Sequence, residues 1–217
     1  MNSYDTFEAA LQAATADLPE LTAEHRAAFA AHWAMVSAWN HQINLMGRVT
    51  ATEAAFLHYR DALAAQPLLE DGPTLDVGSG GGFPGIPLAI AAPTRPFVLM
   101  EPRRKRASLL QTMVARLGLK HVSIHCGRLE DAPEPRFAQL VTRATFSDPK
   151  ALCHGAGWLR PGGRLIAYRS GTSLLVQADH QVLAAVGFGG YQSHPYSVGG
   201  HARRLDVWIL RPDLGHK

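Results

Sequence analysis

The sequence predicts an α/β fold: a mostly parallel sheet of seven strands with helices on both faces and a helical extension at the amino terminus. Three observations lead to this prediction. From residue 74 onward, short apolar runs alternate with segments of helical character, as they do when parallel strands are joined by crossover helices. Before that point, apolar residues recur at helical spacing. The 217 residues suffice for one domain with a substantial core, so we expect an extension over 1–70 and an α/β core over 71–217.

The extension is expected to contain three helices. Phe7 and Leu11 lie four residues apart, which places both on one face of a first helix. Thr22 can cap a second helix, and Thr50-Ala51-Thr52-Glu53 is a capping box for a third helix that runs toward Leu63. The apolar face of the second helix has helical spacing: Phe29, Trp33, Val36, Trp39 (or Asn40) and Ile43.

The core is expected to alternate between strands and helices. Strands are predicted at 74–77, 96–100, 122–125, 139–142 and 164–168, with two more near 189–194 and 204–210. Helices are predicted at 85–91, 104–117, 148–157 and 174–185. Pro161-Gly162-Gly163 is interpreted as a turn before the fifth strand.

A glycine-rich segment directly follows the first strand. It runs from Gly78 to Gly85 and leads into a short helix that has prolines in its first turn. Glycine is needed where the backbone has positive φ or where a ligand must approach closer than a Cβ allows. The start of the helix also offers unpaired N–H groups to an anionic ligand group. The segment therefore predicts a loop that binds a nucleotide-type cofactor.

The spacing of the glycines selects the cofactor. Phe83 occupies the third glycine position of the dinucleotide fingerprint, and no lysine is present for a phosphate-binding P-loop. The acid-x-Gly-x-Gly-x-Gly pattern that begins at Asp76 resembles motif I of the S-adenosylmethionine-dependent methyltransferases. Glu101 ends the next apolar run, where a carboxylate can bind both ribose hydroxyls. We therefore expect cofactor contacts at Gly78, Gly80 and Glu101, with a purely structural turn as the alternative.

The charge is unevenly distributed along the chain. Residues 1–100 hold 4 Arg and no Lys against 10 acidic residues, a net charge of −6, whereas residues 101–217 hold 17 basic and 8 acidic residues, a net charge of +9. This basic half favours a polyanionic partner such as nucleic acid, and a surface that merely keeps the protein soluble is the alternative. Arg103-Arg104-Lys105-Arg106 opens a predicted helix, where positive charge opposes the macrodipole. Helix stability therefore does not explain this run, whereas a nearby RNA backbone would.

The rest of the composition indicates a cytoplasmic protein. The amino terminus lacks the features of a signal peptide, and no apolar run approaches the length that spans a membrane. Cys126 and Cys153 match no metal or redox spacing, so we expect them to be reduced. The eleven histidines include no close ligand set, and we interpret most of them as surface or capping residues. No metal site is predicted.

The chain resembles a known family, the bacterial 16S ribosomal RNA (guanine-N7) methyltransferases called RsmG, once known as glucose-inhibited division protein B. The similarity covers roughly residues 33–170 and, more loosely, the remainder. Its most specific part is the segment from Gly78 to Leu88. The other matching positions are Trp39-Asn40, Asn44-Leu45, His58, Asp61, Lys105-Arg106, Arg128-Leu129-Glu130, Arg143-Ala144 and Arg203. The usual Lys-Gly of the family after the fifth strand is Arg169-Ser170 here.

The resemblance implies a class I methyltransferase (Rossmann-like) fold, S-adenosyl-L-methionine as cofactor and no membrane partner. It implies transfer of a methyl group to N7 of a guanine, position 527 in the usual numbering of 16S rRNA. The substrate would be 16S ribosomal RNA or the small ribosomal subunit particle, and we expect the enzyme to be a monomer. The cofactor contacts of the family would fall on Gly78, Phe83, Leu129, Glu130 and Arg143.

Several of these residues have an alternative interpretation. Phe83 is apolar and precedes a helix, so core packing explains it as well as cofactor contact does. Glu130 lies in a polar segment where a solvated acid is expected, and Arg143 could be structural. His58 and Asp61 lie three residues apart on one helix face, which favours a structural hydrogen bond over a catalytic role.

The expected reaction needs no catalytic acid or base. The lone pair of guanine N7 carries no proton and is already nucleophilic, so alignment of the reacting atoms provides most of the acceleration. We accordingly assign no catalytic residue. Two other functional classes compete with this hypothesis: a methyltransferase for a small molecule or a protein, and a ribosome-binding factor without activity. The basic half argues against the first, and the intact glycine segment argues against the second.

Overall fold

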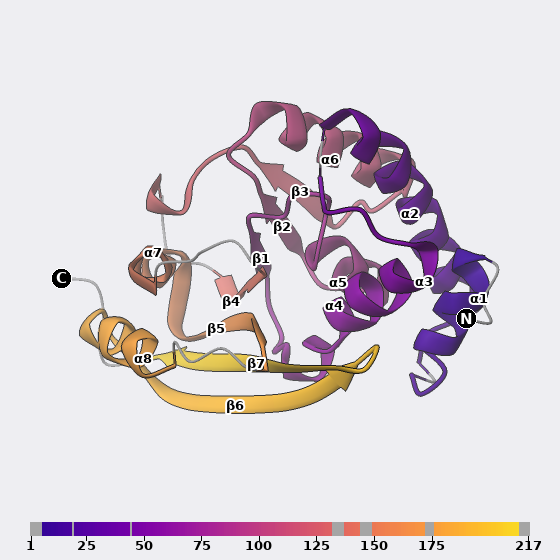
Figure 1. Ribbon diagram of the computed structural model, residues 1–217. Coiled ribbons are helices and arrows are strands. Elements are labelled where there is room, and N and C mark those ends of the chain that lie inside the picture. The colour runs from indigo at the N-terminus through magenta and orange to yellow at the C-terminus, as the bar shows by residue number, and fades with distance from the viewer. Residues whose placement is uncertain are drawn as a thin grey trace.

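A seven-stranded sheet forms the centre of the part of the chain that the computed structural model describes, namely residues 6–18, 20–43, 45–131, 137–143, 149–171 and 176–212. Its strands are β1 (Thr74–Val77), β2 (Phe97–Met100), β3 (Val122–His125), β4 (Phe137–Arg143), β5 (Leu159–Ser170), β6 (Phe188–Val198) and β7 (His201–Leu210). Their order across the sheet is β3-β2-β1-β4-β5-β7-β6 (Figure 1).

The pairing of the strands creates a switch point beside β1. Strands β3, β2, β1, β4 and β5 are parallel neighbours, whereas β7 pairs antiparallel with β5 and with β6. The chain builds the sheet outward from β1 through β2 to β3 and then returns to place β4 on the other side of β1. In open α/β sheets, ligands bind at such a point, beyond the carboxyl ends of the strands. The predicted seven-stranded, mostly parallel sheet is confirmed.

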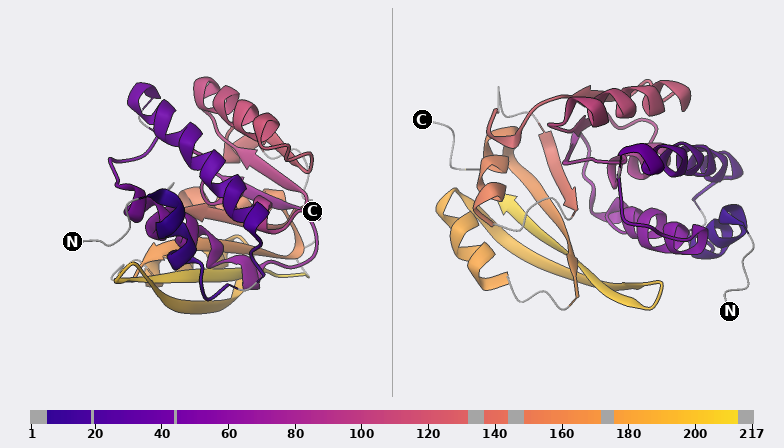
Figure 2. Two further views of the ribbon diagram at one scale, coloured as in Figure 1. Left: turned by 90° about the vertical axis from the view of Figure 1, so that its right-hand side faces the viewer. Right: turned by 45° about the horizontal axis from the view of Figure 1, so that its top comes forward.

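Hydrophobic clusters cover both faces of the sheet. Because successive strand residues point to opposite faces, Val141 and Ile166 belong to one cluster and their neighbours Leu140 and Leu165 to the other. The first cluster is covered by helices α1 (Phe7–Ala14), α2 (Ala23–Ile43), α5 (Gly85–Ala91) and α6 (Arg104–Arg116). The second is covered by the 3₁₀ segment η4 (Cys153–Trp158) and α8 (Val176–Ala185). Figure 2 shows these two groups of helices on opposite sides of the sheet.

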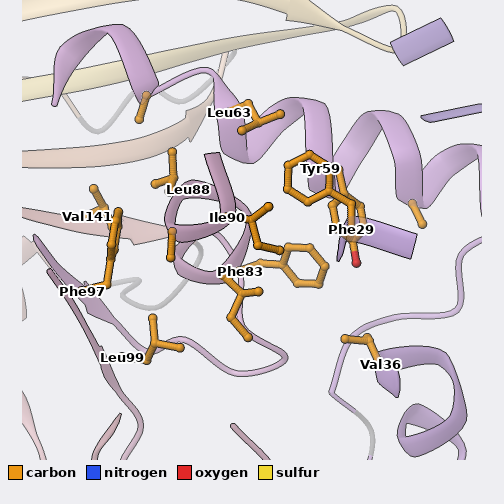
Figure 3. Close-up of a cluster of buried hydrophobic side chains, with 14 of the residues drawn as sticks. Phe29, Val36, Tyr59, Leu63, Phe83, Leu88, Ile90, Phe97, Leu99 and Val141 are labelled. Carbon is orange, nitrogen blue, oxygen red and sulfur yellow. The ribbon is translucent and has the colours of Figure 1, made fainter. Parts of the chain in front are cut away.

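The helical extension packs onto the first face through aromatic side chains. Tyr59 lies 5.5 Å from Phe29 of α2 and 5.1 Å from Phe83 of the glycine segment, measured between ring centroids. All three side chains are buried (Figure 3). The extension is therefore part of the same core that supports the glycine segment.

The third helix of the extension changes its winding along its length. Thr50 caps it as predicted: its Oγ1 accepts a hydrogen bond from the NH of Glu53 at 3.2 Å, and Oε2 of Glu53 accepts one from the NH of Thr50 at 2.7 Å. Helix α3 (Ala51–Ala54) is followed by a π-helical segment, η1 (Ala55–Arg60), and by α4 (Asp61–Leu63). The capping box and the end near Leu63 are confirmed, whereas the π-helical segment was not predicted.

The predicted turn at Pro161-Gly162-Gly163 is wrong, because these residues lie within β5. Phe137 pairs with Leu159, but Gln139 pairs with Arg164, so β5 carries extra residues at an irregularity in the ladder. Gly162 has a φ of +77°, and a Cβ on Gly163 would lie 2.8 Å from a backbone carbonyl oxygen. The glycines therefore serve a bulge in a continuous strand.

Three further elements differ from their predicted limits by several residues. The helix expected at 148–157 is α-helical only over α7 (Pro149–Leu152) and continues as the 3₁₀ segment η4; two glycines in this stretch disfavour a longer α-helix. Strands β6 and β7 extend beyond their predicted ends to meet at Gly199 and Gly200, whose φ values are +54° and +78°. Positive φ at both positions is typical of a two-residue hairpin turn. Of the predicted helices at 148–157 and 174–185, residues 148, 174 and 175 lie outside the described part. Within that part, no helix is long and apolar enough to cross a bilayer.

Candidate active site

A cavity of about 770 Å³ opens at the carboxyl ends of β1, β2 and β4, at the switch point of the sheet. The residues predicted to contact a cofactor all line it: Gly78, Gly80, Phe83, Glu101, Leu129, Glu130 and Arg143. The structure therefore brings together these residues from four separate segments of the chain. Within the described residues, no group of histidine, cysteine and carboxylate side chains is placed to hold a metal ion.

The glycine segment forms the floor of this cavity. Gly78 and Gly80 line it with φ values of +75° and +55°, which side chains other than glycine rarely adopt. A Cβ on Gly80 would meet only the carbonyl oxygen of Gly78, at 3.8 Å. A Cβ on Gly82, by contrast, would lie 2.5 Å from Cδ1 of Ile86. Gly80 therefore leaves space for a ligand, whereas Gly82 leaves space for the protein's own core.

Asp76 holds the segment in place from below. Its side chain is buried, and Oδ2 accepts a hydrogen bond from the NH of Gly85 at 3.0 Å. Its backbone carbonyl accepts one from the hydroxyl of Ser79 at 3.1 Å. Burial raises the pKa of Asp76 to about 7. Asp76 does not line the cavity, so in this structure the acid of the glycine motif shapes the loop.

His32 is a site residue that the sequence analysis missed. It is buried under the glycine segment, and its Nε2 lies 3.0 Å from the carbonyl oxygen of Gly81. Its Nδ1 lies 2.9 Å from the hydroxyl of Tyr59. Burial lowers the pKa of His32 to about 4, so the ring is neutral at pH 7, donates from Nε2 and accepts at Nδ1. Its position between Phe29 and Val36, at helical spacing on the buried face of α2, was the available signal.

This buried histidine predicts a loss of stability in acid. The unfolded chain protonates His32 below pH about 6.5, whereas the folded chain keeps it neutral down to pH about 4. Unfolding therefore takes up a proton in this window, and stability falls as the pH drops through it. Between pH 6.5 and 5 the expected loss is on the order of 2 kcal/mol. Asp76 and His58 also titrate differently in the folded and unfolded chains. The contribution of His32 is therefore the difference between the parent and His32→Phe in urea unfolding at pH 7 and pH 5.

The variant His32→Phe should lose part of this pH dependence, because its side chain cannot titrate. His41→Phe is the matched control, since His41 lies on the same helix with an exposed side chain. An equal loss of stability between pH 7 and pH 5 in the parent and in His32→Phe would contradict the assignment.

Glu101 joins the end of β2 to the glycine segment. Its side chain is buried, and Oε2 accepts a hydrogen bond from the NH of Gly80 at 3.2 Å. Oε1 accepts one from the NH of Arg103 at 2.9 Å. A carboxylate has about four acceptor positions, so both oxygens retain capacity for hydroxyl groups of a ligand. The structure thus places Glu101 at the cavity, as the sequence predicted, and shows that its carboxylate also fixes the loop.

Leu129 and Glu130 form the opposite wall, in the 3₁₀ segment η3 (Leu129–Asp131). Leu129 is buried, and its carbonyl accepts a hydrogen bond from Nε1 of Trp158 at 2.7 Å. Glu130 is exposed at the rim of the cavity. Its placement fits both interpretations given above, cofactor contact and solvated acid.

Arg143 connects the cavity to the helical extension. Its Nη1 donates to the carbonyl of Leu57 at 3.2 Å and to Oδ2 of Asp61 at 3.1 Å, and its Nη2 lies 3.2 Å from Nδ1 of His58. Its guanidinium carbon lies 5.3 Å from the centroid of the Phe83 ring. Asp61 and His58 thus both meet Arg143, which supports a structural role for the pair. Burial and the adjacent Arg143 lower the pKa of His58 to about 3, so this ring is neutral.

Phe83 packs in the core and also faces the cavity. Its ring packs against His32, Tyr59 and His58 at centroid distances of 5.0, 5.1 and 5.2 Å, and it also lines the cavity. It is therefore a core residue that also forms part of the cavity wall.

Solved structures of other proteins share this fold. A SAM-dependent O-methyltransferase from Thermotoga maritima matches with a TM-score of 0.58 and 15% identity, over 84% of this chain and 73% of that one. A SAM-dependent methyltransferase from Aquifex aeolicus matches with a TM-score of 0.54 and 18% identity, over 68% of this chain and 87% of that one. The predicted class I methyltransferase fold is confirmed.

Curated relatives are more similar in sequence. The protein "Ribosomal RNA small subunit methyltransferase G" of Aromatoleum aromaticum is 35% identical over 214 residues, 96% of this chain and 98% of the relative. Proteins of the same name are 36% identical in Solibacter usitatus, over 70% of this chain and 73% of the relative, and 37% identical in Stenotrophomonas maltophilia, over 63% and 65%. The sequence model of the GidB family, described as rRNA small subunit methyltransferase G, matches residues 25–186. The resemblance noted from the sequence is thereby confirmed, and the chain belongs to the GidB family of small-subunit rRNA methyltransferases.

Proposed function

We propose that the chain transfers the methyl group of S-adenosylmethionine to N7 of a guanine in 16S ribosomal RNA. The family and the names of its relatives support an enzyme that methylates small-subunit rRNA. The observation that carries the proposal is the cavity, where an open glycine floor faces a buried carboxylate and a rim of cations. We further expect a cytoplasmic monomer that uses no metal and acts on the RNA alone or within the small-subunit particle.

The cavity fits S-adenosylmethionine. Its floor has left-handed glycines, and a side chain at Gly80 would fill space that no other described side chain uses. Glu101 offers acceptor capacity for the ribose hydroxyls, and Leu129 offers an apolar surface for the adenine. Phe83 and Arg143 complete the wall on the side of the helical extension. When bound, S-adenosylmethionine supplies an electrophilic methyl group on a sulfonium centre.

The residues of the cavity hold and align the reactants. Guanine N7 needs no deprotonation, so neither Glu101 nor His58 has to move a proton during transfer. Preorganised binding of this kind can supply most of the acceleration. The packed aromatic wall around Phe83 limits the access of water to that side of the cavity.

The cationic rim supports RNA as the substrate. Arg103, Arg106 and Arg128 line the cavity, and Arg104 and Lys105 are exposed beside them at the start of α6. Within the described residues, Arg103, Arg104 and Lys105 form no ion pair. Glu101 accepts a hydrogen bond from the backbone NH of Arg103 but forms no ion pair with the Arg103 side chain. The side chains of Arg103, Arg104 and Lys105 are therefore available to bind the phosphate backbone of an RNA.

The double variant Arg103→Glu with Arg104→Glu should weaken RNA binding and flatten its salt dependence, because fewer counterions are released per complex. Cofactor affinity should stay near the parent value. The measurement is RNA affinity across a salt series. Arg116→Glu with Lys120→Glu is the matched control: it makes the same charge change at exposed positions near the other end of α6, about 20 Å away. Equal slopes and affinities for the parent and the Arg103/Arg104 variant would place the RNA elsewhere.

The choice of N7 is tested with a modified RNA. In 7-deazaguanosine a C–H group replaces N7, while the Watson–Crick edge is unchanged. We expect transfer of labelled methyl groups to a 16S rRNA substrate, free or in subunit particles, and no transfer when 7-deazaguanosine replaces guanosine. Retained transfer to the substituted RNA would show that another atom is the acceptor.

A further inference from the structure

Asp61 lies at the point where the helical extension, the sheet and the β6–β7 hairpin meet. Its side chain is 6% exposed, and its two oxygens have different partners. Oδ2 accepts a hydrogen bond from Nη1 of Arg143 on β4, and Oδ1 accepts one from the hydroxyl of Tyr196 on β6 at 2.7 Å. Nε of Arg203 on β7 lies 3.9 Å from Oδ1. One buried carboxylate thus joins three strands.

The π-helical segment before Asp61 makes this arrangement possible. In a regular α-helix the NH of Asp61 would donate to the carbonyl of Leu57, but here it donates to those of Phe56 and His58. The carbonyl of Leu57 accepts a hydrogen bond from Arg143 instead. The change of winding therefore turns backbone and side-chain acceptors of one helical turn toward the same guanidinium. Such π-helical segments are frequent at functional sites.

The contacts of Arg143 divide into neutral and charged ones. The carbonyl of Leu57 and the neutral ring of His58 orient the guanidinium, and Asp61 brings a negative charge to within 3.1 Å of it. Hydrogen bonds between charged groups are shorter and stronger than neutral ones. Loss of the carboxylate should therefore loosen Arg143 without removing it from the cavity wall.

Anchoring of the helix does not depend on Asp61 alone. The hydroxyl of Tyr168 on β5 donates to the carbonyl of the next residue, Ala62. Tyr59 and Leu63, on the same helix, are buried in the first hydrophobic cluster. These contacts remain when the carboxylate of Asp61 is replaced by an amide, so the helix should stay in place.

We infer that Asp61 is a positioning residue of the cofactor site: it fixes Arg143 at the cavity and couples that residue to the β6–β7 hairpin through Tyr196. The inference rests on the part of the proposed function that makes Arg143 a cofactor contact. It assigns no chemical step to Asp61. Burial and the neighbouring Asp61 raise the pKa of Tyr196, so its hydroxyl remains a donor at physiological pH.

The test is a double-mutant cycle read out as S-adenosylmethionine affinity by titration calorimetry. Asp61→Asn should weaken binding about tenfold, because the contact with Arg143 loses its negative charge while part of the hydrogen bonding survives. In an Arg143→Met background, the same change should alter affinity less than about twofold, because the residue through which it acts is gone. Asp17→Asn is the control, since Asp17 pairs with Arg60 of the same helix at the surface and should leave affinity unchanged.

Equal effects of Asp61→Asn in both backgrounds, or no effect of Arg143→Met on affinity, would overturn the inference. Tyr196→Phe tests the link to the hairpin separately. This variant removes the hydroxyl that donates to Asp61 and keeps the aromatic ring. It should weaken cofactor binding in the parent and have no further effect in Asp61→Asn; an unchanged affinity in the parent would refute the coupling to the hairpin. Since every readout is cofactor affinity, a failure here is distinguishable from failure to methylate RNA.

Discussion

Replacing Gly80 by valine is expected to abolish S-adenosylmethionine binding while the protein remains folded. Gly80 lines the cavity at a φ of +55°, and its Cβ position is open except for the carbonyl oxygen of Gly78 at 3.8 Å. The Cβ of valine would therefore point into space that we assign to the cofactor, and it would not overlap another described atom. The left-handed backbone would also cost on the order of 1–3 kcal/mol. Titration calorimetry and thermal melting separate the two effects.

Two other glycines make this prediction specific. Gly118 has a φ of +66°, and no atom of the described residues lies within 4 Å of its Cβ position; it lies outside the cavity lining. Gly118→Val should lower the melting temperature by a similar amount and bind cofactor like the parent. Gly82→Val should instead disrupt the fold, because its Cβ would lie 2.5 Å from Ile86. Parent-like affinity in a folded Gly80→Val variant would refute the assignment of this loop.

Replacing Glu101 by alanine is expected to have the second-largest effect. The carboxylate is proposed to bind the ribose hydroxyls, and it also accepts the backbone NH groups of Gly80 and Arg103. Loss of charge-assisted hydrogen bonds typically costs about 1.5–3 kcal/mol, a decrease in cofactor affinity of about 10- to 150-fold. Because the floor also loses its anchor, we expect the upper part of this range. Calorimetric titration with S-adenosylmethionine measures the change.

Glu101→Gln separates the two tasks of the residue. The amide keeps the shape of the side chain and one oxygen acceptor for the loop, but it loses the negative charge. We expect a smaller decrease in affinity than in Glu101→Ala. The melting temperature should fall below that of the parent, because the amide NH2 faces one of the two backbone NH groups. Reduced RNA affinity with unchanged cofactor affinity, in either variant, would contradict the role given to Glu101.

The parts of the site that sequence could predict depend on local patterns. The limits of β1 and β3 follow from short apolar runs. The capping box was predictable because its two residues, Thr50 and Glu53, lie within four positions of the sequence. The positions of the glycine segment and of Glu101 were predictable because each directly follows a predicted strand, β1 and β2. Since parallel strands share one carboxyl edge, their meeting in one cavity follows from the fold class.

The parts that could not be predicted depend on contacts between distant segments. Arg143 and Asp61 are separated by 82 residues, and His32 and Gly81 by 49. A pattern within a short stretch of sequence cannot predict contacts between residues so far apart. The bulge in β5 was misread because Pro-Gly-Gly is typical of turns, and the ladder with β4 overrides that local preference.

The central claim is that the chain methylates guanine N7 in small-subunit ribosomal RNA. Mass spectrometry of digested 16S rRNA, from cells that carry the gene and from cells that lack it, tests this most directly. We expect one 7-methylguanosine that is present with the gene, absent without it, restored by the parent gene and not restored by the Gly80→Val variant. Identical 7-methylguanosine content in the rRNA of both cell types would contradict the account.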